Sequence, residues 1–394
     1  ITMSAEDLDN KIATAVAQGV EKAKSVVGGE AGTGGASSVH YDRPLSDFSV
    51  KVVQDDSEFS ARKIVSNFNS KHRQDMYYFY EPAYFMVNQV AERAEGTEAA
   101  KARYGVSRKS YATKVYALKQ PVTDEQVANS DQPVDRDYED ATTFITRQFL
   151  LNKEKKCTTA LLKTATWSTD WAGSGTAPAA SAIVANGAFH KFSDAASKPL
   201  DVLDEAFQAV QLKSGMRPNT LVMPRSVFTG LKRNPQIRGL KLYTNQNSTT
   251  DDATLDTIAG HLGIPASNIF VLDVVEPATA ATVDGTTYKI TTDGEGYASA
   301  TEGDGTADTI AGAFMGGNGI LIMHINPNSN GRYEATAAVC AQWTGLYPDA
   351  GELGNTVIKR YREERLSSEM IEGRTAFSYH IVAPALGAYL NDVL

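Results

Sequence analysis

The sequence contains little cysteine and no long hydrophobic run. Of its 394 residues only Cys157 and Cys340 are cysteines, which excludes a disulfide-stapled scaffold and a cysteine-rich zinc fold. Because Cys157 lies in a helical pattern and Cys340 in a strand-like one, we interpret both as small core residues, consistent with a reducing compartment. The most apolar stretch, Gly319–Ile325, is far shorter than the ~18 residues of a membrane span, so no membrane association is expected. The N-terminus shows no secretory signal pattern.

The chain is also short of positive charge. Lysine and arginine number 38 against 47 aspartates and glutamates, which gives a formal net charge of −9. A protein that binds the phosphates of a nucleic acid needs a basic surface, so nucleic-acid binding is not the expected activity. Hydrophobic residues make up 42% and charged residues 22%, as in ordinary globular domains. The length of the chain predicts two or three domains.

Motifs of nucleotide-binding and hydrolytic enzymes are absent. The sequence has no GxxxxGK[ST] loop, no GxSxG elbow and no HExxH helix. The Gly-rich tracts Gly32–Ser37 and Gly316–Gly319 lack the strand–loop–helix context of a pyrophosphate cradle, and we interpret them as a linker and a turn. The histidines are scattered without metal-ligand spacing, and they are His40, His72, His190, His261, His324 and His380.

Adjacent carboxylates are the remaining candidates for acid–base chemistry. Asp55 with Asp56, and Glu363 with Glu364, are more typical of a solvated strand edge than of a catalytic pair. We therefore predict no catalytic, cofactor-binding or metal-binding residues, no cofactor, and a protein that is not an enzyme.

The N-terminal region combines a helix with a flexible tract. Residues 4–27 carry apolar side chains at helical spacing behind a possible Ser4 N-cap, and two glycines end the pattern. Gly28–Ser38 reads as a soft linker, and residues 39–60 as extended chain. The sequence leaves open whether this helix is a docking arm or a loosely packed N-terminal helix.

An aromatic hairpin is predicted next. The dense aromatic run 75–87 and the strand-like run Ser110–Leu118 flank a polar stretch, Ala91–Arg103. An aromatic run this dense and this interrupted by charge is excessive for a small solvated hairpin. It favours a hairpin that lies on a neighbouring subunit, although an ordinary half-buried hairpin also fits.

A long helix is predicted over residues 138–166, which contain no proline or glycine and place their apolar side chains on one face. At 1.5 Å per residue it would be about 40 Å long, well above the average. Residues 167–200 read as a loop-like stretch that carries Trp167 and Trp171.

Alternating helix and strand signals follow. The predicted helices are Leu200–Ser214, Ser226–Asn234 and Thr254–Leu262, and the predicted strands are Thr220–Met223, Ile269–Leu272 and Gly319–Ile325. Residues 276–310 form a polar insertion, expected to be a hairpin. Further strands are expected at Ala335–Trp343, Val357–Leu366 and Tyr379–Ala383. Charges of both signs in Lys359–Arg365 predict an exposed strand able to form ion pairs between subunits.

The order of these parts resembles the major capsid proteins of tailed bacteriophages with the Hong Kong 97-type fold. The stretches that carry the resemblance are Ser110–Asp131, Tyr138–Trp167, Leu203–Arg225, Arg233–Gly239, Val357–Arg365 and Ile381–Leu390. None is specific alone, but their order is. The N-terminal helix with its linker and the 276–310 insertion have no fixed counterpart in that family.

The resemblance implies an α+β fold with named parts. These are an N-terminal helix, linker and arm (1–60), an E-loop hairpin (61–118), a peripheral or P domain with a spine helix (119–199, helix 138–166), an α/β axial or A domain (200–334, insertion 276–310), and returning P-domain strands (335–394).

The resemblance also implies a function. The expected protein is a structural major capsid protein that self-assembles through pentamers and hexamers into an icosahedral shell around double-stranded DNA, without sequence-specific DNA binding. Portal, scaffold or decoration proteins would be its partners. Assembly in the host cytoplasm, procapsid maturation and a final place in the virion would follow. The alternatives are an encapsulin-like nanocompartment shell and, less favoured, an α/β enzyme. No covalent cross-link is predicted.

Overall fold

The computed structural model describes most of the chain beyond the N-terminal region. The described residues are 59–80, 84, 86–93, 95–96, 98–129, 134–176, 183–243, 251–283, 286–290, 296–299, 309–326, 335–346 and 356–394. The chain divides into two units, 1–40 and 41–394, and all described residues belong to the second. The predicted N-terminal helix and linker, and the Asp55–Asp56 pair, lie outside the described residues.

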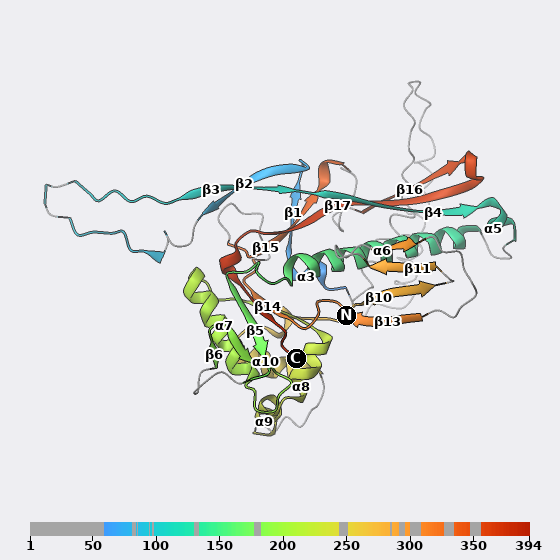
Figure 1. The fold of residues 1–394 in the computed structure, drawn as a ribbon. Coiled ribbons are helices and arrows are strands. Elements are labelled where there is room, and N and C mark those ends of the chain that lie inside the picture. The colour runs from blue at the N-terminus through green and yellow to red at the C-terminus, as the bar shows by residue number, and fades with distance from the viewer. Residues whose placement is uncertain are drawn as a thin grey trace, which may run out of the picture. The chain divides into compact units, whose positions relative to one another are not determined.

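A five-stranded sheet is built around one long strand (Figure 1). Its members are β1 (Ser66–Ser70), β15 (Ala338–Trp343), β17 (Ser368–Ile381), β16 (Thr356–Glu363) and β4 (Lys114–Thr123). β17 pairs with β4 along one edge, and with β16 and then β15 along the other, all antiparallel. β1 adds to β15 in parallel. The sequence predicted only a short strand where β17 runs for 14 residues.

The long helix α6 (Val134–Leu161) packs against this sheet through one apolar face. The packing is close: a Cβ on Gly373 of β17 would lie 2.5 Å from Ile145 and 2.4 Å from Phe149, so only glycine fits there. The helix ends five residues before the predicted 166, because the indole Nε1 of Trp167 donates to the carbonyl oxygen of Leu161 (2.8 Å) and satisfies a terminal acceptor.

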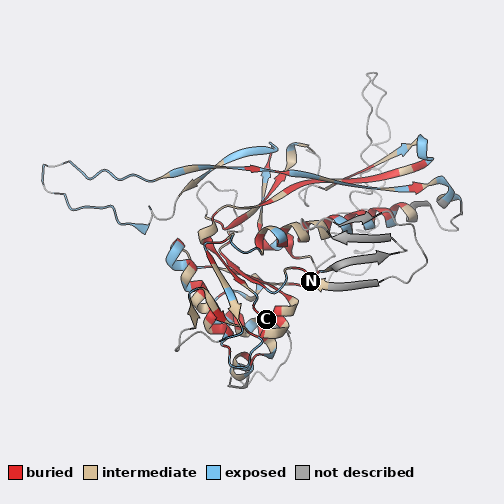
Figure 2. Cartoon of the chain, in the orientation of Figure 1, coloured by how far each residue is buried: buried red, intermediate tan, exposed pale blue. Residues whose placement is uncertain are grey.

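A second, seven-stranded sheet has the strand order β6-β7-β5-β18-β14-β8-β9. In chain order these strands are β5 (Thr169–Ser174), β6 (Val184–Ala185), β7 (Ala188–His190), β8 (Thr220–Pro224), β9 (Ile269–Leu272), β14 (Ile320–Met323) and β18 (Gly387–Asn391). The helices that pack with it are α7 (Pro199–Ser214), α8 (Arg225–Arg233), α9 (Pro235–Tyr243) and α10 (Asp251–Leu262). Figure 2 shows the buried residues gathered in these strands and along β17.

Two predictions for this region were wrong. Residues 167–200 are not a loop, since β5 to β7 occupy part of them and extend the sheet. The last stretch, Ile381–Leu390, does not return wholly to the first sheet, because β18 lies inside the second sheet between β5 and β14. The sheet therefore joins chain segments that the predicted boundary at residue 200 separated.

The insertion forms a four-stranded sheet rather than the predicted hairpin. Its strands are β10 (Val275–Val283), β11 (Thr286–Ile290), β12 (Gly296–Ser299) and β13 (Thr309–Phe314), in the order β12-β11-β10-β13. An ion pair between Lys155 and Glu276 joins the start of β10 to α6.

The aromatic region forms a two-stranded hairpin of β2 (Gln74–Tyr80) and β3 (Val106–Ala112). It is shorter than the predicted range 61–118, because α3 (Ala61–Ile64) and β1 precede it in the body and β4 continues from it into the first sheet. The short helix α5 (Asp124–Asn129) follows β4. Single 3₁₀ turns lie at η1 (Ala266–Asn268), η2 (Thr344–Leu346), η3 (Glu364–Leu366) and η4 (Pro384–Leu386).

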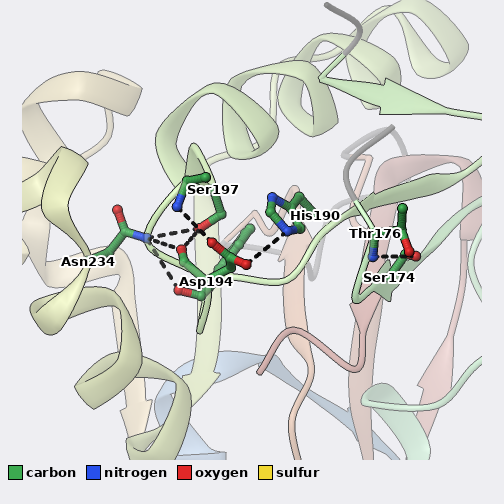
Figure 3. Close-up of polar contacts among 8 residues, drawn as sticks. Ser174, Thr176, His190, Asp194, Ser197 and Asn234 are labelled. Atoms are coloured by element: carbon green, nitrogen blue, oxygen red, sulfur yellow. Dashed lines mark hydrogen bonds and ion pairs between the residues drawn. The ribbon is translucent and has the colours of Figure 1, made fainter. Parts of the chain in front are cut away.

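A buried asparagine ties the helical layer of the second sheet to the loop after β7 (Figure 3). The side-chain amide of Asn234 donates to the Ser197 hydroxyl (3.0 Å) and to the carbonyl oxygens of Phe192 (3.2 Å) and Asp194 (3.5 Å). Its carbonyl oxygen accepts from the Gln236 backbone N–H (2.9 Å) and so caps α9. One side chain thus fixes both a helix start and a loop.

Candidate assembly surface

The β2–β3 hairpin has two faces of different character. Strand register places Met76, Tyr78 and Tyr80 on one face with Val106 and Arg108, because alternate residues of paired strands share a face. Asp75, Tyr77 and Phe79 lie on the other face, opposite Tyr111, Lys109 and Ser107.

The second of these faces is held by the chain's own body. The Tyr111 hydroxyl donates to Ser70 Oγ (2.8 Å), and its ring lies 6.0 Å from that of His380. The Lys109 ammonium group donates to the Val382 carbonyl oxygen (3.4 Å) and sits 3.9 Å from the Phe79 ring centre. Burial lowers the pKa of His380, so its imidazole is held neutral at this joint. The base of the hairpin is therefore fixed in direction.

The first face is open to solvent. Met76 is 67% exposed, Tyr78 60% and Val106 43%. The Arg108 guanidinium group lies 5.3 Å from the Tyr78 ring centre, a cation–π distance. Aromatic side chains, methionine and arginine are the residues enriched where proteins bind one another. We name this set, Met76, Tyr78, Val106 and Arg108, the open face.

Beyond the strands, the described residues from 84 to 104 are all exposed. The two arms of this tip are joined by Gln89, whose amide donates to the carbonyl oxygens of Tyr84 and Arg103 (3.3 Å each) and accepts from the Arg103 N–H (3.2 Å). A shallow hollow lies between the arms, lined by Tyr84, Val87, Gln89, Lys101 and Arg103. A segment this exposed gains little stability within its own subunit.

The charged strand predicted as an exposed source of ion pairs between subunits is mostly satisfied within the chain. In β16, Arg360 pairs with Glu369, and Arg362 pairs with Asp124 (2.6 Å). Lys359 is buried. The prediction of an exposed strand is wrong for most of β16: within the strand only Arg362 is exposed, and the turn after it exposes Glu364 and Arg365.

The remaining candidates for chemistry stay apart. Among the described residues, no group of three or more histidine, cysteine or acidic side chains could hold a metal ion. His190 contacts Asp194 (3.4 Å), while His261 contacts Asp204 (2.9 Å) on another element. Within the part of the chain that the structure describes, no helix is long and apolar enough to cross a membrane. Cys157 and Cys340 are both buried, which confirms their interpretation as core residues.

A buried charged cluster near the start of α3 was not predicted from sequence. The Glu154 carboxylate of α6, fully buried, accepts from the Ser60 hydroxyl (2.9 Å) and the Ala61 backbone N–H (2.8 Å). Burial raises the pKa of Glu154, and these hydrogen bonds oppose the shift only in part. Burial also lowers the pKa of the neighbouring Lys153 to about 8. In the sequence both residues belong to the charged run Lys153–Lys156, which does not show which of its charges are buried.

Comparison with known proteins decides the family. A family model described as "Phage capsid protein" matches residues 107–347, more than half of the chain. The chain belongs to the phage capsid protein family. This is a family of structural proteins rather than enzymes, in agreement with the sequence interpretation.

Two further similarities accompany this capsid family assignment. A "Major capsid protein" of Burkholderia phage BcepMu is 35% identical over 65 residues, which span 16% of this chain and only 21% of that protein. A phage-related protein of Bordetella bronchiseptica RB50 aligns over 91% of this chain and 99% of its own, with 14% identity and a TM-score of 0.59. The predicted fold class, an α+β fold of the Hong Kong 97 type, is confirmed.

Proposed function

We propose that this chain is the structural major capsid protein of a tailed double-stranded DNA phage, assembling with itself through pentamers and hexamers into an icosahedral shell. Membership of the capsid family and the local similarity to a major capsid protein support the proposal. A shell protein needs extended lateral contacts rather than one deep pocket, and the exposed hairpin provides such a contact.

The two-faced hairpin is the observation that carries the proposal. The face that packs on the body of the chain is fixed by Tyr111 and Lys109, while the open face presents Met76 and Tyr78 to solvent. An isolated hairpin of two strands is only marginally stable in water. Its exposed apolar side chains gain burial when a neighbouring copy covers them, and repeated weak contacts of this kind add up around a ring.

The parts of the fold take the following roles in the proposal. The hairpin between 74 and 112 serves as the E-loop. The five-stranded sheet with α6 as its spine helix serves as the P domain. The seven-stranded sheet with α7 to α10 serves as the A domain. For residues 1–60, the N-terminal helix, linker and arm stay a prediction.

The proposed surroundings follow from the same role. The shell encloses double-stranded DNA without sequence-specific binding, and a net charge of −9 supports this, since a strongly basic wall would retain the genome. Portal, scaffold or decoration proteins are its proposed partners. It would be assembled in the host cytoplasm, mature from a procapsid, and end in the virion.

Deleting the hairpin tip tests the proposal. In the full chain, residues 91–103 are removed in one variant and replaced by a Gly/Ser segment of equal length in a second. Circular dichroism reports folding, and size exclusion with negative-stain electron microscopy reports assembly. Because the tip lies outside the three hydrophobic clusters, the deletion should leave folded subunits that assemble poorly. The Gly/Ser variant keeps the length of the hairpin but removes the side chains of the tip, so it shows whether poor assembly comes from the shorter hairpin or from the missing side-chain contacts.

Two results would contradict different parts of the proposal. Normal shells from the deletion variant would show that the tip makes no required contact and would refute the role of the hairpin tip, while the role as a shell protein would stand. A wild-type chain that stays a monomer or dimer across salt and protein concentration would refute the proposed function itself. The contents of wild-type shells separate the alternatives, since DNA indicates a virus and enzyme cargo indicates an encapsulin-like compartment.

A further inference from the structure

We propose that the corner between α8 and α9 binds the phosphate groups of nucleic acid through Arg233 and Arg238, without reading the base sequence. We name these two side chains the cationic corner. The choice of double-stranded DNA as the nucleic acid rests on the proposed function, whereas the affinity for phosphates follows from the charges and contacts of the corner itself. The corner is a local exception in a chain whose formal net charge is −9.

The charge of the chain is unevenly distributed. Between Glu205 and Asp251 the sequence contains no acidic residue, although a segment of that length would hold about five at the average composition of the chain. Basic residues continue through the same segment, and they are Lys213, Arg217, Arg225, Lys232, Arg233, Arg238 and Lys241. A segment with charge of one sign produces a local positive potential even on an acidic protein.

Some of these cations are used inside the chain, but the cationic corner is not. Arg225 forms an ion pair with Asp273 (2.7 Å), and the Arg217 guanidinium group donates to a backbone carbonyl oxygen (2.6 Å). Arg233 and Arg238 are both exposed, and neither guanidinium group makes a hydrogen bond or an ion pair with any residue that the structure describes. Their donors are therefore available to a ligand.

The backbone that carries the two arginines is held rigidly. Asn234 lies between them, and its buried amide is bonded to the loop after β7 (Figure 3). The Arg238 backbone N–H donates to the Asn234 carbonyl oxygen (3.1 Å). The Gln236 side chain accepts from the Leu200 N–H (3.0 Å) and donates to the Asp201 carboxylate (3.0 Å). A fixed backbone reduces the entropy that is lost when a ligand binds.

The position of Arg238 favours an anion. It lies in the first turn of α9, the positive end of the helix dipole, where a cation does not stabilise the helix. Neither α8 nor α9 has an acidic residue in its first turn. The carboxylates nearby already have partners, since Asp201 contacts Lys198 (3.9 Å) and Asp194 contacts His190 (3.4 Å). Planar guanidinium groups match the geometry of phosphate oxygens.

Fluorescence anisotropy of a labelled DNA duplex of about 30 base pairs, titrated with the full chain between about 50 and 200 mM KCl, tests the inference. The variant Arg233→Gln/Arg238→Gln removes both charges of the corner. The control Arg147→Gln/Lys163→Gln removes two exposed charges outside it, which matches the change in net charge. A third variant, Arg233→Lys/Arg238→Lys, keeps the charges but not the forked geometry. Thermal melting reports folding, and electron microscopy reports assembly.

We expect the wild type to bind two duplexes of unrelated sequence equally, with a Kd of about 10⁻⁴–10⁻⁶ M, as is usual for non-specific binding. The glutamine variant of the corner should bind at least tenfold more weakly at the lower salt concentration. Its plot of log affinity against log salt should be less steep by about 1.8, the value for two lost phosphate contacts. The control should bind as the wild type does, and the lysine variant should keep the wild-type slope. All variants should melt together, because neither arginine supports the fold.

Four results would overturn the inference. They are a wild type that does not bind the duplex, equal weakening in the corner variant and the control, poor assembly of the corner variant with unchanged DNA binding, and displacement of the duplex by inorganic phosphate beyond the effect of KCl at equal ionic strength. The third result would assign the corner to a contact between copies, and the fourth to a small-anion site. Shells from a wild type that does not bind DNA would leave the proposed function standing. Conversely, a wild type that binds DNA through the corner but never assembles would refute the proposed function alone.

Discussion

Replacing Glu154 by alanine should destabilise the subunit by about 3–5 kcal/mol. The carboxylate is fully buried and accepts two hydrogen bonds, from the Ser60 hydroxyl at 2.9 Å and the Ala61 N–H at 2.8 Å. Alanine leaves both buried donors without these acceptors, at about 1–3 kcal/mol each. The lost side chain also leaves a cavity, which adds to the cost.

The matched variant is Glu154→Gln, which keeps the shape of the side chain. Its amide oxygen can accept from the Ala61 N–H while its NH₂ group donates to the Ser60 hydroxyl, so the cost should stay near or below about 1 kcal/mol. The pKa of Glu154 is raised in the folded chain, so the folded state holds its proton to higher pH than the unfolded state does. Wild-type stability should therefore fall as pH rises from the unfolded pKa, 4.5, through the folded one, and the glutamine variant should lose this dependence.

Equilibrium urea unfolding of the unassembled subunit, followed by tryptophan fluorescence between pH 4.5 and 8, measures both effects. The reasoning would be refuted if Glu154→Ala unfolded within about 1 kcal/mol of wild type, since buried donors would then be satisfied elsewhere. It would also fail if the glutamine variant kept the wild-type slope with pH.

Two other changes probe buried polar groups. The pKa of Lys153 falls from 10.5 to about 8 on folding, so the unfolded chain binds more protons between these values and wild-type stability should rise with pH across that window. Lys153→Met should raise the free energy of unfolding at pH 7 and should remove its increase with pH, whereas the exposed control Lys163→Met should keep that increase. Urea unfolding measures the free energy at each pH, and the same pH dependence in both variants would contradict the prediction. Asn234→Ala removes the α9 cap and the bonds to the loop after β7, and should cost about 2–4 kcal/mol. Thermal melting compares Asn234→Ala with the control Gln211→Ala on the exposed side of α7. Equal melting temperatures would show that the Asn234 hydrogen bonds do not contribute to stability.

Sequence patterns located the long elements because their signals are local. The apolar spacing that predicted a helix over 138–166 corresponds to α6, and the four-residue apolar run at β14 was recognisable as a buried strand. The end of α6 was missed because it depends on a bond from Trp167, a residue outside the helix. Helix α9 was missed because Pro235 follows a predicted helix end, although it actually occupies the first position of the next helix behind the Asn234 cap.

Sheet membership was harder to predict, because it depends on pairing between distant segments. β5 carries few of the β-branched residues typical of strands, and it is defined by its parallel pairing with β18. β18 in turn resembles any short apolar strand, and only its neighbours β14 and β5 place it in the second sheet. The local sequence of a strand does not show which distant strands it pairs with.

The candidate surface could be predicted only as an aromatic hairpin. Tyr77 and Phe79 look no different in sequence from Met76 and Tyr78, yet the first pair turns toward the body and the second toward solvent. The distinction comes from Tyr111 and Lys109, which anchor one face through Ser70 and Val382. Residues 70 and 382 are too distant in the chain for any sequence period to reveal the contact.

The strand β17 has a mechanical consequence. Its hydrogen-bonded register with β4 runs without a break from Ser368 opposite Thr123 to Phe377 opposite Lys114, while β16 and β15 share its other edge. A force applied along this strand loads all of these bonds in parallel, whereas a force across it opens them one after another. The subunit should therefore be stiff to shear along β17 and compliant to peeling, so the direction of load, more than its size, would decide whether the sheet yields.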